Sequence, residues 1–308
     1  MTPAEFLKLA AEYKLEHIGQ ALLSTSVSGI RALDGAMRDA NSGDRTFIGG
    51  MPSPMPPQWP SHKEMPLTFV AQTDTETLPA GISPVPLPPG VLQFFVPSTG
   101  EANDYEPSLD AGRVLFVPAG DVLSEDSGEP LLREGAGQPG REASLVSRIV
   151  GLFGVVPRGQ SAAALEHPHR VFPKRGFDWE VFPTLYASAP DAESLWLPDS
   201  AQHFEFNHEA DWDSYFEFRR VVMACPRWNW LVQMFGFANE QQEDMQPLVD
   251  VASGRRSLNE FKDWLMLFAL NSACKGLAPE AVCYYFWIHR DDLASGNFDE
   301  VWLCTQQD

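Results

Sequence analysis

The stretch Phe47-Ile48-Gly49-Gly50-Met51-Pro52-Ser53-Pro54 opens the part of the chain that decides the fold. The segment Gln58-Trp59-Pro60 follows it, and then a short apolar run, Leu67–Gln72, which ends on an amide. Adjacent glycines allow backbone angles that other residues resist, while prolines fix φ and remove hydrogen-bond donors. The stretch therefore predicts a strand end, a glycine turn, a rigid loop that carries a tryptophan, and a second, interior strand.

A pair of strands with this character occurs twice. Leu67–Gln72 and Val91–Val96 form the first pair, and Trp264–Asn271 and Val282–Ile288 form the second. The chain also contains 26 Pro and 23 Gly, which indicate many turns and irregular connections. These features predict an α+β fold with internally duplicated, mostly antiparallel sheets and Pro-rich connections.

The start of the chain predicts helices. Thr2 can cap a helix, Pro3 suits its first position, and Glu5 completes a capping box. We expect a helical segment over residues 1–46, a first sheet half over 47–134 and a second sheet half over 135–308. The division falls at the Gly-rich stretch Gly135–Gly140, and we expect the halves to pack as one compact unit.

The charge of the chain restricts its partners. The 308 residues include 22 basic and 42 acidic side chains, for a net charge of −20. An acidic surface repels nucleic acid and anionic lipid, and it raises the association rate of basic partners. No apolar run approaches the roughly 20 residues that span a bilayer. We therefore expect neither nucleic acid nor a membrane as a partner.

The cysteines predict a reducing compartment. All four (Cys225, Cys274, Cys283 and Cys304) lie in the last third of the chain, and none forms a C-x-x-C motif. Buried thiols in the cytoplasm are the simplest interpretation. The sequence also lacks a nucleophile elbow, a phosphate loop and a zinc-protease motif, so we expect no catalytic residues, no metal and no cofactor.

Several of these segments together resemble YwqG-like proteins, a bacterial family of unknown function. The resemblance rests on Gly49-Gly50-Met51-Pro52, Trp59-Pro60, Leu67–Gln72, Gly90–Phe95, Gly236, Gln242–Met245, Trp264–Ser272, Tyr285–Ile288, Asp291-Asp292-Leu293, Phe298, Val301-Trp302 and Gln306. It implies an α+β fold with an internal duplication and no known activity. Relatives occur beside toxin systems, which suggests an immunity role.

The sequence departs from the family pattern at three places. Asn229 stands where a histidine is expected, Phe237-Ala238 replaces Tyr-Pro, and Leu270 replaces a glutamine. If these polar residues form a pocket in the family, that pocket is altered in this chain.

The first functional hypothesis is an interaction protein that captures a basic partner. The partner would be an antibacterial toxin such as a nuclease, and the role would be immunity. Acidic residues around a helix entrance would meet the positive charge, and aromatic residues among them would anchor the interface. The residues expected on this surface are Glu205, Glu209, Asp211, Trp212, Asp213, Tyr215 and Glu217.

The second hypothesis is an enzyme or small-ligand binder that uses a cleft between the two halves. Amides recur at strand ends, where they can line a polar cleft or satisfy neighbouring backbone groups. The residues expected to line the cleft are Trp59, Gln72, Asn229, Gln233 and His289.

Overall fold

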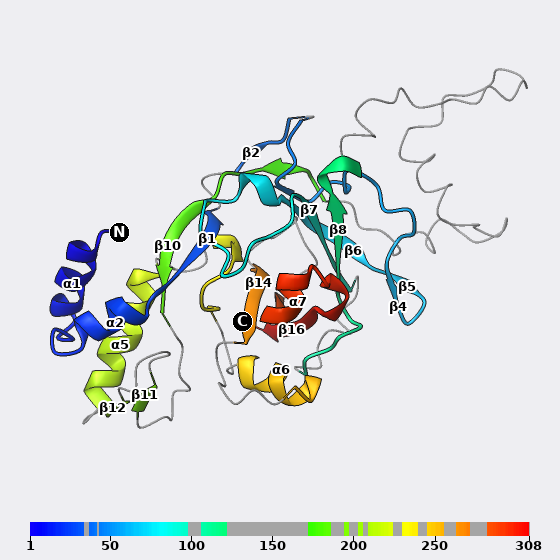
Figure 1. Cartoon of the computed structure of the whole chain (residues 1–308). Helices are drawn as coiled ribbons and strands as arrows, with labels where there is room; N and C mark the ends of the chain where they lie inside the picture. Colours follow the sequence, from blue (N-terminus) through cyan, green and yellow to red (C-terminus); the bar gives the residue numbers. More distant parts are fainter. Residues whose placement is uncertain are drawn as a thin grey trace, which may run out of the picture.

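The computed structural model describes the backbone of residues 1–33, 37–41, 43–97, 106–121, 172–185, 194–196, 203–205, 209–223, 230–239, 245–255, 263–271 and 282–307. Within these residues, most of the strands form two six-stranded sheets (Figure 1). The first sheet has the order β2 (Arg38–Asp39), β9 (Arg175–Gly176), β3 (Phe47–Ile48), β6 (Thr68–Asp74), β7 (Gly90–Val96) and β8 (Arg113–Pro118). The second sheet has the order β10 (Glu180–Thr184), β1 (Val27–Leu33), β13 (Trp230–Met234), β14 (Trp264–Leu270), β15 (Val282–His289) and β16 (Trp302–Gln307).

Shorter elements complete the described part of the chain. The α-helices are α1 (Pro3–Glu12), α2 (Gly19–Thr25), α5 (Glu209–Val222), α6 (Met245–Ser253) and α7 (Arg290–Ser295). Single 3₁₀ turns lie at η2 (Thr75–Thr77) and η5 (Phe298–Glu300), and two hairpin-like pairs are β4 (Ser61–His62) with β5 (Met65–Pro66) and β11 (Ser194–Trp196) with β12 (His203–Glu205). The pairings within both sheets are antiparallel, so the predicted α+β fold is confirmed.

The two predicted strand pairs lie in matching places. The first belongs to the meander β3-β6-β7-β8 and the second to the meander β13-β14-β15-β16. In each meander the second strand has a register shift against the third, between Phe69 and Ala71 in β6 and between Met266 and Phe268 in β14. Such bulges bend a strand locally. The shared order and bulge agree with the repeat seen in the sequence, while descent from a duplicated ancestor stays a prediction.

The core lies between the two sheets. Phe94 of β7 stacks on Phe268 of β14 with ring centroids 4.1 Å apart, and it meets Phe286 of β15 edge-on at 5.4 Å. All three rings are fully buried in one cluster that draws residues from both sheets. The centre of the interface between the sheets is therefore packed with side chains.

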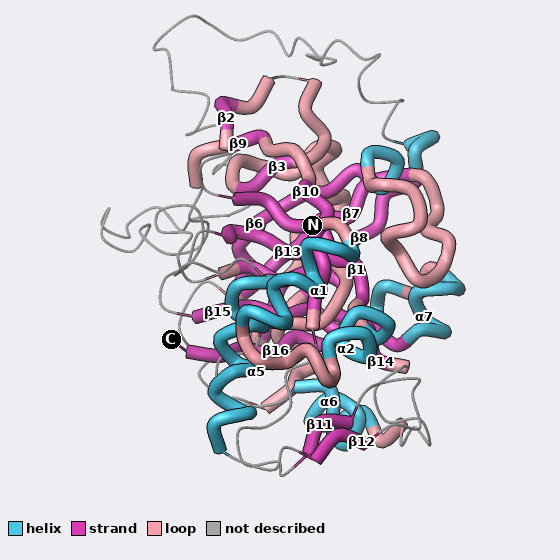
Figure 2. The backbone as a smooth tube through the Cα atoms, turned by 90° about the vertical axis from the view of Figure 1, so that its left-hand side faces the viewer, coloured by secondary structure: helices cyan, strands magenta, loops and turns pink. Residues whose placement is uncertain are grey.

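The helices cover other surfaces. Helices α1, α2 and α5 lie together on one side of the molecule (Figure 2). Phe6 of α1 packs edge-on against Phe218 of α5 with centroids 5.1 Å apart. Helix α6 places Met245 and Val249 on the outer face of the second sheet, against a cluster that contains Trp264. Apolar faces of short helices are thus buried by tertiary packing, on which such helices depend.

The N-terminal segment departs from the expected helical character. The capping box is present, because the backbone N–H of Thr2 donates to Glu5 Oε2 at 2.7 Å and that of Glu5 donates to Thr2 Oγ1 at 3.3 Å. The first of these bonds lowers the pKa of the Glu5 carboxyl. Residues 1–46 also contain β1 and β2, however, and these strands join different sheets.

Two further expectations about strands need revision. Strand β9 comes from the sequence expected to form the second half, yet it pairs with β3 in the first sheet. The run Phe298–Leu303 near the end of the sequence also predicts a closing strand, but Phe298–Glu300 forms the turn η5 and β16 starts only at Trp302. Sheet membership therefore does not follow the expected division of the chain.

Candidate functional site

A pocket of about 380 Å³ lies where segments from both ends of the chain meet. Its size falls in the range of about 300–1,000 Å³ that is typical of ligand sites. The walls come from the start of β1, the loop after η2, the turn after β13, the start of α6, the start of β14 and the start of α7. The lining residues are Ser26, Val27, Ser28, Gly81, Ile82, Pro84, Phe235, Gly236, Phe237, Gln246, Trp264, Leu265, Met266 and Arg290. We call this cavity the junction pocket.

The turn Phe235-Gly236-Phe237 forms one wall in an unusual conformation. Both Phe235 (φ 55°) and Gly236 (φ 72°) have left-handed backbone angles. Glycine adopts this region freely, but a bulky aromatic residue does so at a cost of about 1–3 kcal/mol. Such strain persists where the surroundings enforce it, and it clusters at ligand sites and switch regions.

The surroundings hold this turn by specific bonds. The side-chain amide of Gln233 donates to the carbonyls of Phe235 at 3.1 Å and Phe237 at 2.9 Å. Thr184 Oγ1 accepts from the backbone N–H of Phe237 at 2.8 Å and donates to the carbonyl of Val27 at 2.6 Å. The turn, β10 and β1 are thus joined at one point, and the pocket wall is fixed in advance of binding.

The lining of the junction pocket is mainly apolar. Among the lining residues, the polar groups are the hydroxyls of Ser26 and Ser28, the amide of Gln246 and the guanidinium of Arg290. The Ser26 hydroxyl donates to the carbonyl of Leu23 at 2.8 Å, and the Gln246 amide donates to the carbonyl of Trp264 at 2.8 Å. The described lining contains no histidine, cysteine or carboxylate. It can hold a molecule, but it lacks the paired base and nucleophile of covalent catalysis.

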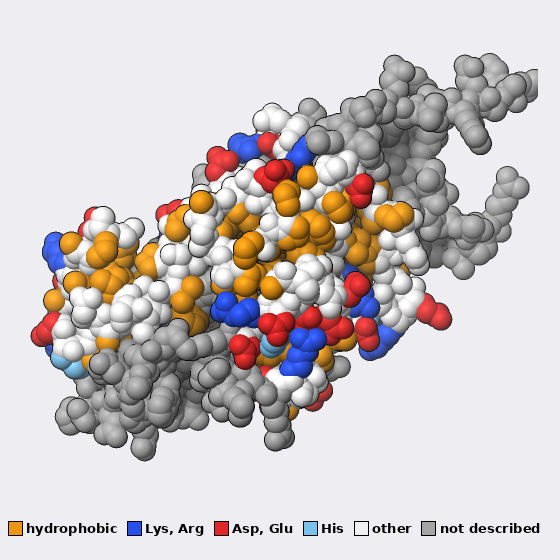
Figure 3. All heavy atoms as spheres, viewed as in Figure 1, with side chains coloured by type: hydrophobic (Ala, Val, Ile, Leu, Met, Phe, Trp, Pro, Cys, Tyr) orange, Lys and Arg blue, Asp and Glu red, His pale blue; other side chains and the backbone are white. Residues whose placement is uncertain are grey.

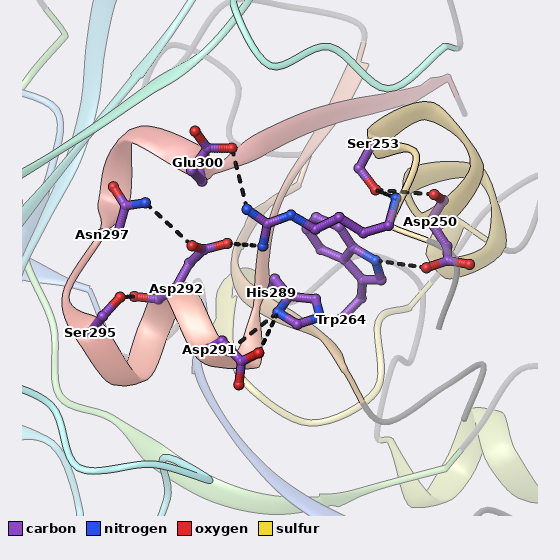
Figure 4. Close-up of polar contacts among 10 residues, drawn as sticks. Asp250, Ser253, Trp264, His289, Asp291, Asp292, Ser295, Asn297 and Glu300 are labelled. Carbon is purple, nitrogen blue, oxygen red and sulfur yellow. Dashed lines mark hydrogen bonds and ion pairs between the residues drawn. The ribbon is translucent and has the colours of Figure 1, made fainter. Parts of the chain in front are cut away.

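Beside the pocket, a polar network fixes α6 and α7 (Figure 4). Trp264 Nε1 donates to Asp250 Oδ1 of α6 at 3.2 Å, and the indole meets the ring of His289 edge-on with centroids 5.4 Å apart. The buried carboxylate of Asp292 in α7 binds the guanidinium of Arg255. These carboxylates have basic or indole partners, so the network orients the pocket wall rather than adding a reactive group.

The residues predicted to line a cleft do not come together. Trp59 and Gln72 lie over the outer face of the first sheet, where Trp59 Nε1 donates to the carbonyl of Leu67 at 2.7 Å. Gln72 Oε1 accepts from the backbone N–H of Ser53 at 2.9 Å. These groups serve the Pro-rich loop, so the structural interpretation of the buried amides holds here.

The other three predicted cleft residues have separate places. Gln233 is near the junction pocket, but it acts by bonding the strained turn. His289 caps α7, since its Nδ1 accepts from the backbone N–H of Asp291 at 3.3 Å. Asn229 lies outside the described residues. The pocket between chain segments exists, but its lining differs from the prediction.

Sequence reasoning missed most of the junction pocket. Val27, Leu265 and Arg290 come from segments far apart in the chain and carry no motif. Gly236 between two phenylalanines was the available signal, because a glycine at the end of an apolar strand marks a special backbone angle.

The structure changes the predicted acidic surface. Tyr215 is fully buried among the residues that α1 and α5 share, so it does not present its ring to a partner; burial also raises the pKa of its phenol. Asp213 and Glu217 are exposed on α5, and Glu217 pairs with Arg220. The side chains of Glu205, Glu209, Asp211 and Trp212 lie outside the described part of the structure, although their backbone belongs to β12 and α5.

A second cavity, of about 560 Å³, lies at the edge of the first sheet. Its charged lining is already paired. The guanidinium of Arg38 binds both carboxylate oxygens of Asp44 and lowers the pKa of that carboxyl. Arg45 lies 4.0 Å from Asp74. A ligand here would have to displace internal ion pairs, which makes this cavity the weaker candidate.

The fold and the junction pocket together define an α+β protein of two packed sheets, with a ligand-sized pocket where described segments from both ends of the chain meet. The chain belongs to the family described as "Domain of unknown function (DUF1963)", whose model matches residues 46–306. A comparison with curated proteins found no match. Within the part of the chain that the structure describes, no helix is long and apolar enough to cross a membrane.

Proposed function

We propose that this chain is a non-enzymatic binding protein that holds a small, largely apolar ligand in the junction pocket. The observation that carries the proposal is the fixed wall at Phe235-Gly236-Phe237, where a strained backbone borders a ligand-sized cavity. A pocket whose shape is set before binding loses little conformational entropy when a ligand enters. Figure 3 agrees, because hydrophobic side chains gather at the centre of the face that carries β1 and α7.

A neutral fluorescent probe tests this function. N-phenyl-1-naphthylamine brightens in apolar surroundings and carries no charge, so its binding reports the apolar walls alone. We expect saturable emission with the parent protein and loss of that emission in Ser28→Trp. Ser28 is exposed at the pocket, so the indole fills the cavity without entering the core.

Ser24→Trp is the matched control, since Ser24 is exposed on α2 and does not line the pocket. This variant should bind the probe as the parent does. Equal emission from the two tryptophan variants, or no saturable emission from the parent, would show that the junction pocket is not a binding site.

A second candidate function is capture of a basic partner by an acidic surface, in an immunity role in the cytoplasm. The observations that favour it are the net charge of −20 and the exposed Asp213 and Glu217, which lie one turn apart on α5. The resemblance to YwqG-like proteins supports the setting, and the buried thiols of Cys283 and Cys304 suit a reducing compartment. The partner would be a basic toxin domain such as a nuclease.

A retention experiment and a charge-matched pair of variants test this second candidate. In the retention experiment, the tagged parent chain is used to capture basic proteins from its native host at low and high salt, and the captured proteins are identified by mass spectrometry. We expect one basic toxin to be retained at low salt and released by high salt. Replacing Glu209, Asp211 and Asp213 together by Ala should slow its association about tenfold.

The control is the triple alanine variant at Glu16, Glu64 and Asp299, which are exposed elsewhere and remove the same charge. Equal association rates for the two triple variants would mean that net charge, and not the α5 surface, governs capture. Neutralisation of the toxin by the α5 triple variant at the parent's potency would remove this surface from the interface.

A further inference from the structure

The junction pocket lies in line with β13 of the second sheet. In the order of that sheet, β13 runs between β1 and β14 and is antiparallel to both. Strand β13 ends at Met234, and the chain then turns away at Phe235–Phe237. Strands β1 and β14 continue beyond this point, and the stretches that continue include the pocket-lining residues Val27-Ser28 and Trp264–Met266. The pocket therefore occupies the place that a longer β13 would take.

The two flanking strands are unpaired on the side that faces this place, as far as the described strands go. Strand β1 pairs with β10 from Val27 onward, but its pairing with β13 starts only at Ile30. Strand β14 pairs with β13 no nearer to the pocket than Ala269. Neighbouring strands lie about 4.8 Å apart, so a gap of one strand separates β1 from β14. We call this gap, between Val27-Ser28 and Trp264–Met266, the strand slot.

Two hydrogen bonds show which groups of β14 point into the strand slot. The backbone N–H of Phe235 donates to the carbonyl of Met266 at 3.1 Å, so this carbonyl points toward the side of β13. Residues two apart in a strand present their main-chain groups to the same side, so the carbonyl of Trp264 points there as well. The side-chain amide of Gln246 donates to that carbonyl at 2.8 Å. A side-chain donor thus bonds the strand edge where a neighbouring strand would bond it.

Close packing at two glycines explains why the chain leaves the strand slot. A Cβ on Gly29 of β1 would lie 2.9 Å from the carbonyl oxygen of Phe235, and a Cβ on Gly236 would lie 3.1 Å from Cα of Gly29. The turn therefore crosses over β1 at close range, and the N–H of Phe237 bonds Thr184 Oγ1 of β10. Because the turn is held against β1 and β10, it ends the row of β13 and leaves the two strand edges facing the pocket.

We propose that the ligand of the junction pocket is a short, extended peptide segment, which adds to the second sheet as a strand between β1 and β14. This inference rests on the proposed ligand-binding function and names the class of its ligand. In strand addition, main-chain hydrogen bonds give affinity, and pockets for alternate side chains give specificity. The three lining residues of β14 extend over about 10 Å at 3.3 Å per residue, which is enough for about three peptide residues.

The walls above and below the strand slot indicate which side chains the peptide would carry. Ile82 belongs to the core cluster between the two sheets, whereas α6, which carries Gln246, lies on the outer face of the second sheet. Successive side chains of a strand point to opposite faces. A peptide side chain on the inner face would therefore meet apolar atoms of Ile82 and Pro84, so we expect an apolar residue at that position.

Competition against the neutral naphthylamine probe tests the inference. The competitors are acetyl-Leu-Val-Leu-amide and the same peptide with N-methyl groups on its valine and its second leucine. Adjacent residues of a strand bond opposite neighbours, so the methyl groups remove one donor toward each wall. We expect the methylated peptide to compete about tenfold to a hundredfold more weakly, the loss of two net hydrogen bonds. A pocket that recognises apolar surface alone would bind it at least as well, because methylation makes the peptide more apolar.

Isotope-edited infrared spectroscopy gives a second reading that does not depend on affinity. A ¹³C label at the valine carbonyl of the unmethylated peptide should give an amide I band at the position of a β-strand when the peptide is bound. This band should appear with the parent protein and with Ser24→Trp. It should be absent with Ser28→Trp, whose indole fills the pocket beside the β1 edge.

The outcomes separate the strand assignment from the ligand-binding function. If the probe binds but the two peptides compete equally, or neither competes, the peptide does not add as a strand and the small-ligand function stands. A bound peptide whose labelled band lacks the β-strand position has the same meaning. If the parent protein shows no saturable probe emission, the ligand-binding function is wrong and the strand assignment is wrong with it.

Discussion

Phe94→Ala is expected to lower the free energy of unfolding by about 3–5 kcal/mol, the range for a fully buried aromatic side chain cut to a methyl group. The ring of Phe94 stacks on Phe268 and meets Phe286, so its loss opens a cavity between the two sheets. Because both partners belong to the opposite sheet, no local rearrangement within β7 fills this space. Urea unfolding followed by tryptophan fluorescence and by circular dichroism would measure the change.

Two variants calibrate that loss. Phe94→Leu keeps most of the volume but removes the stacked ring, and it should cost less than about 1.5 kcal/mol. Phe216→Ala shortens a partly exposed phenylalanine of α5 and should also cost much less than Phe94→Ala. If Phe94→Ala and Phe216→Ala lowered the free energy of unfolding by the same small amount, the stacked ring would not contribute to holding the sheets together. Coincident transitions by the two probes are needed before the values are compared.

The sequence predicted the strands that carry this core, because they are short apolar runs bounded by turn residues. Val91–Val96 and Val282–Ile288 correspond to β7 and β15, each within two residues. The sequence did not predict that β1, from the expected helical segment, would join the second sheet. It also did not predict that β9, from the expected second half, would join the first sheet. A two-residue strand such as β9 has no periodicity to read, and its pairing with β3 is decided by contacts about 130 residues away.

The candidate site was less predictable than the fold for a related reason. Buried amides such as Gln72 and Gln233 look alike in sequence whether they line a cleft or bond a backbone carbonyl, and here both bond the backbone. The lining of the junction pocket depends on how a turn, a loop and a helix start converge.

Gly49→Ala is expected to cost about 3 kcal/mol or more, because it combines backbone strain with a clash that no side chain can relieve. Gly49 has φ 69°, and its backbone N–H donates to the carbonyl of Val70 in β6 at 2.8 Å. A Cβ built on it would lie 2.2 Å from the carbonyl oxygen of Pro173 and 3.2 Å from Cβ of Phe172. The segment that leads into β9 would have to move away from β3.

Gly296→Ala is the control that separates the two causes of this loss. Gly296 ends α7 with nearly the same angle, φ 71°, but no atom lies within 4 Å of the Cβ position. Gly296→Ala should therefore lower the free energy of unfolding only by the strain of a left-handed backbone, about 1–2 kcal/mol. The difference between the two variants measures how firmly β9 is held against the first sheet. A difference near zero would mean that the segment before β9 can shift without loss of stability. Glycine would then be needed at position 49 for its backbone angle alone.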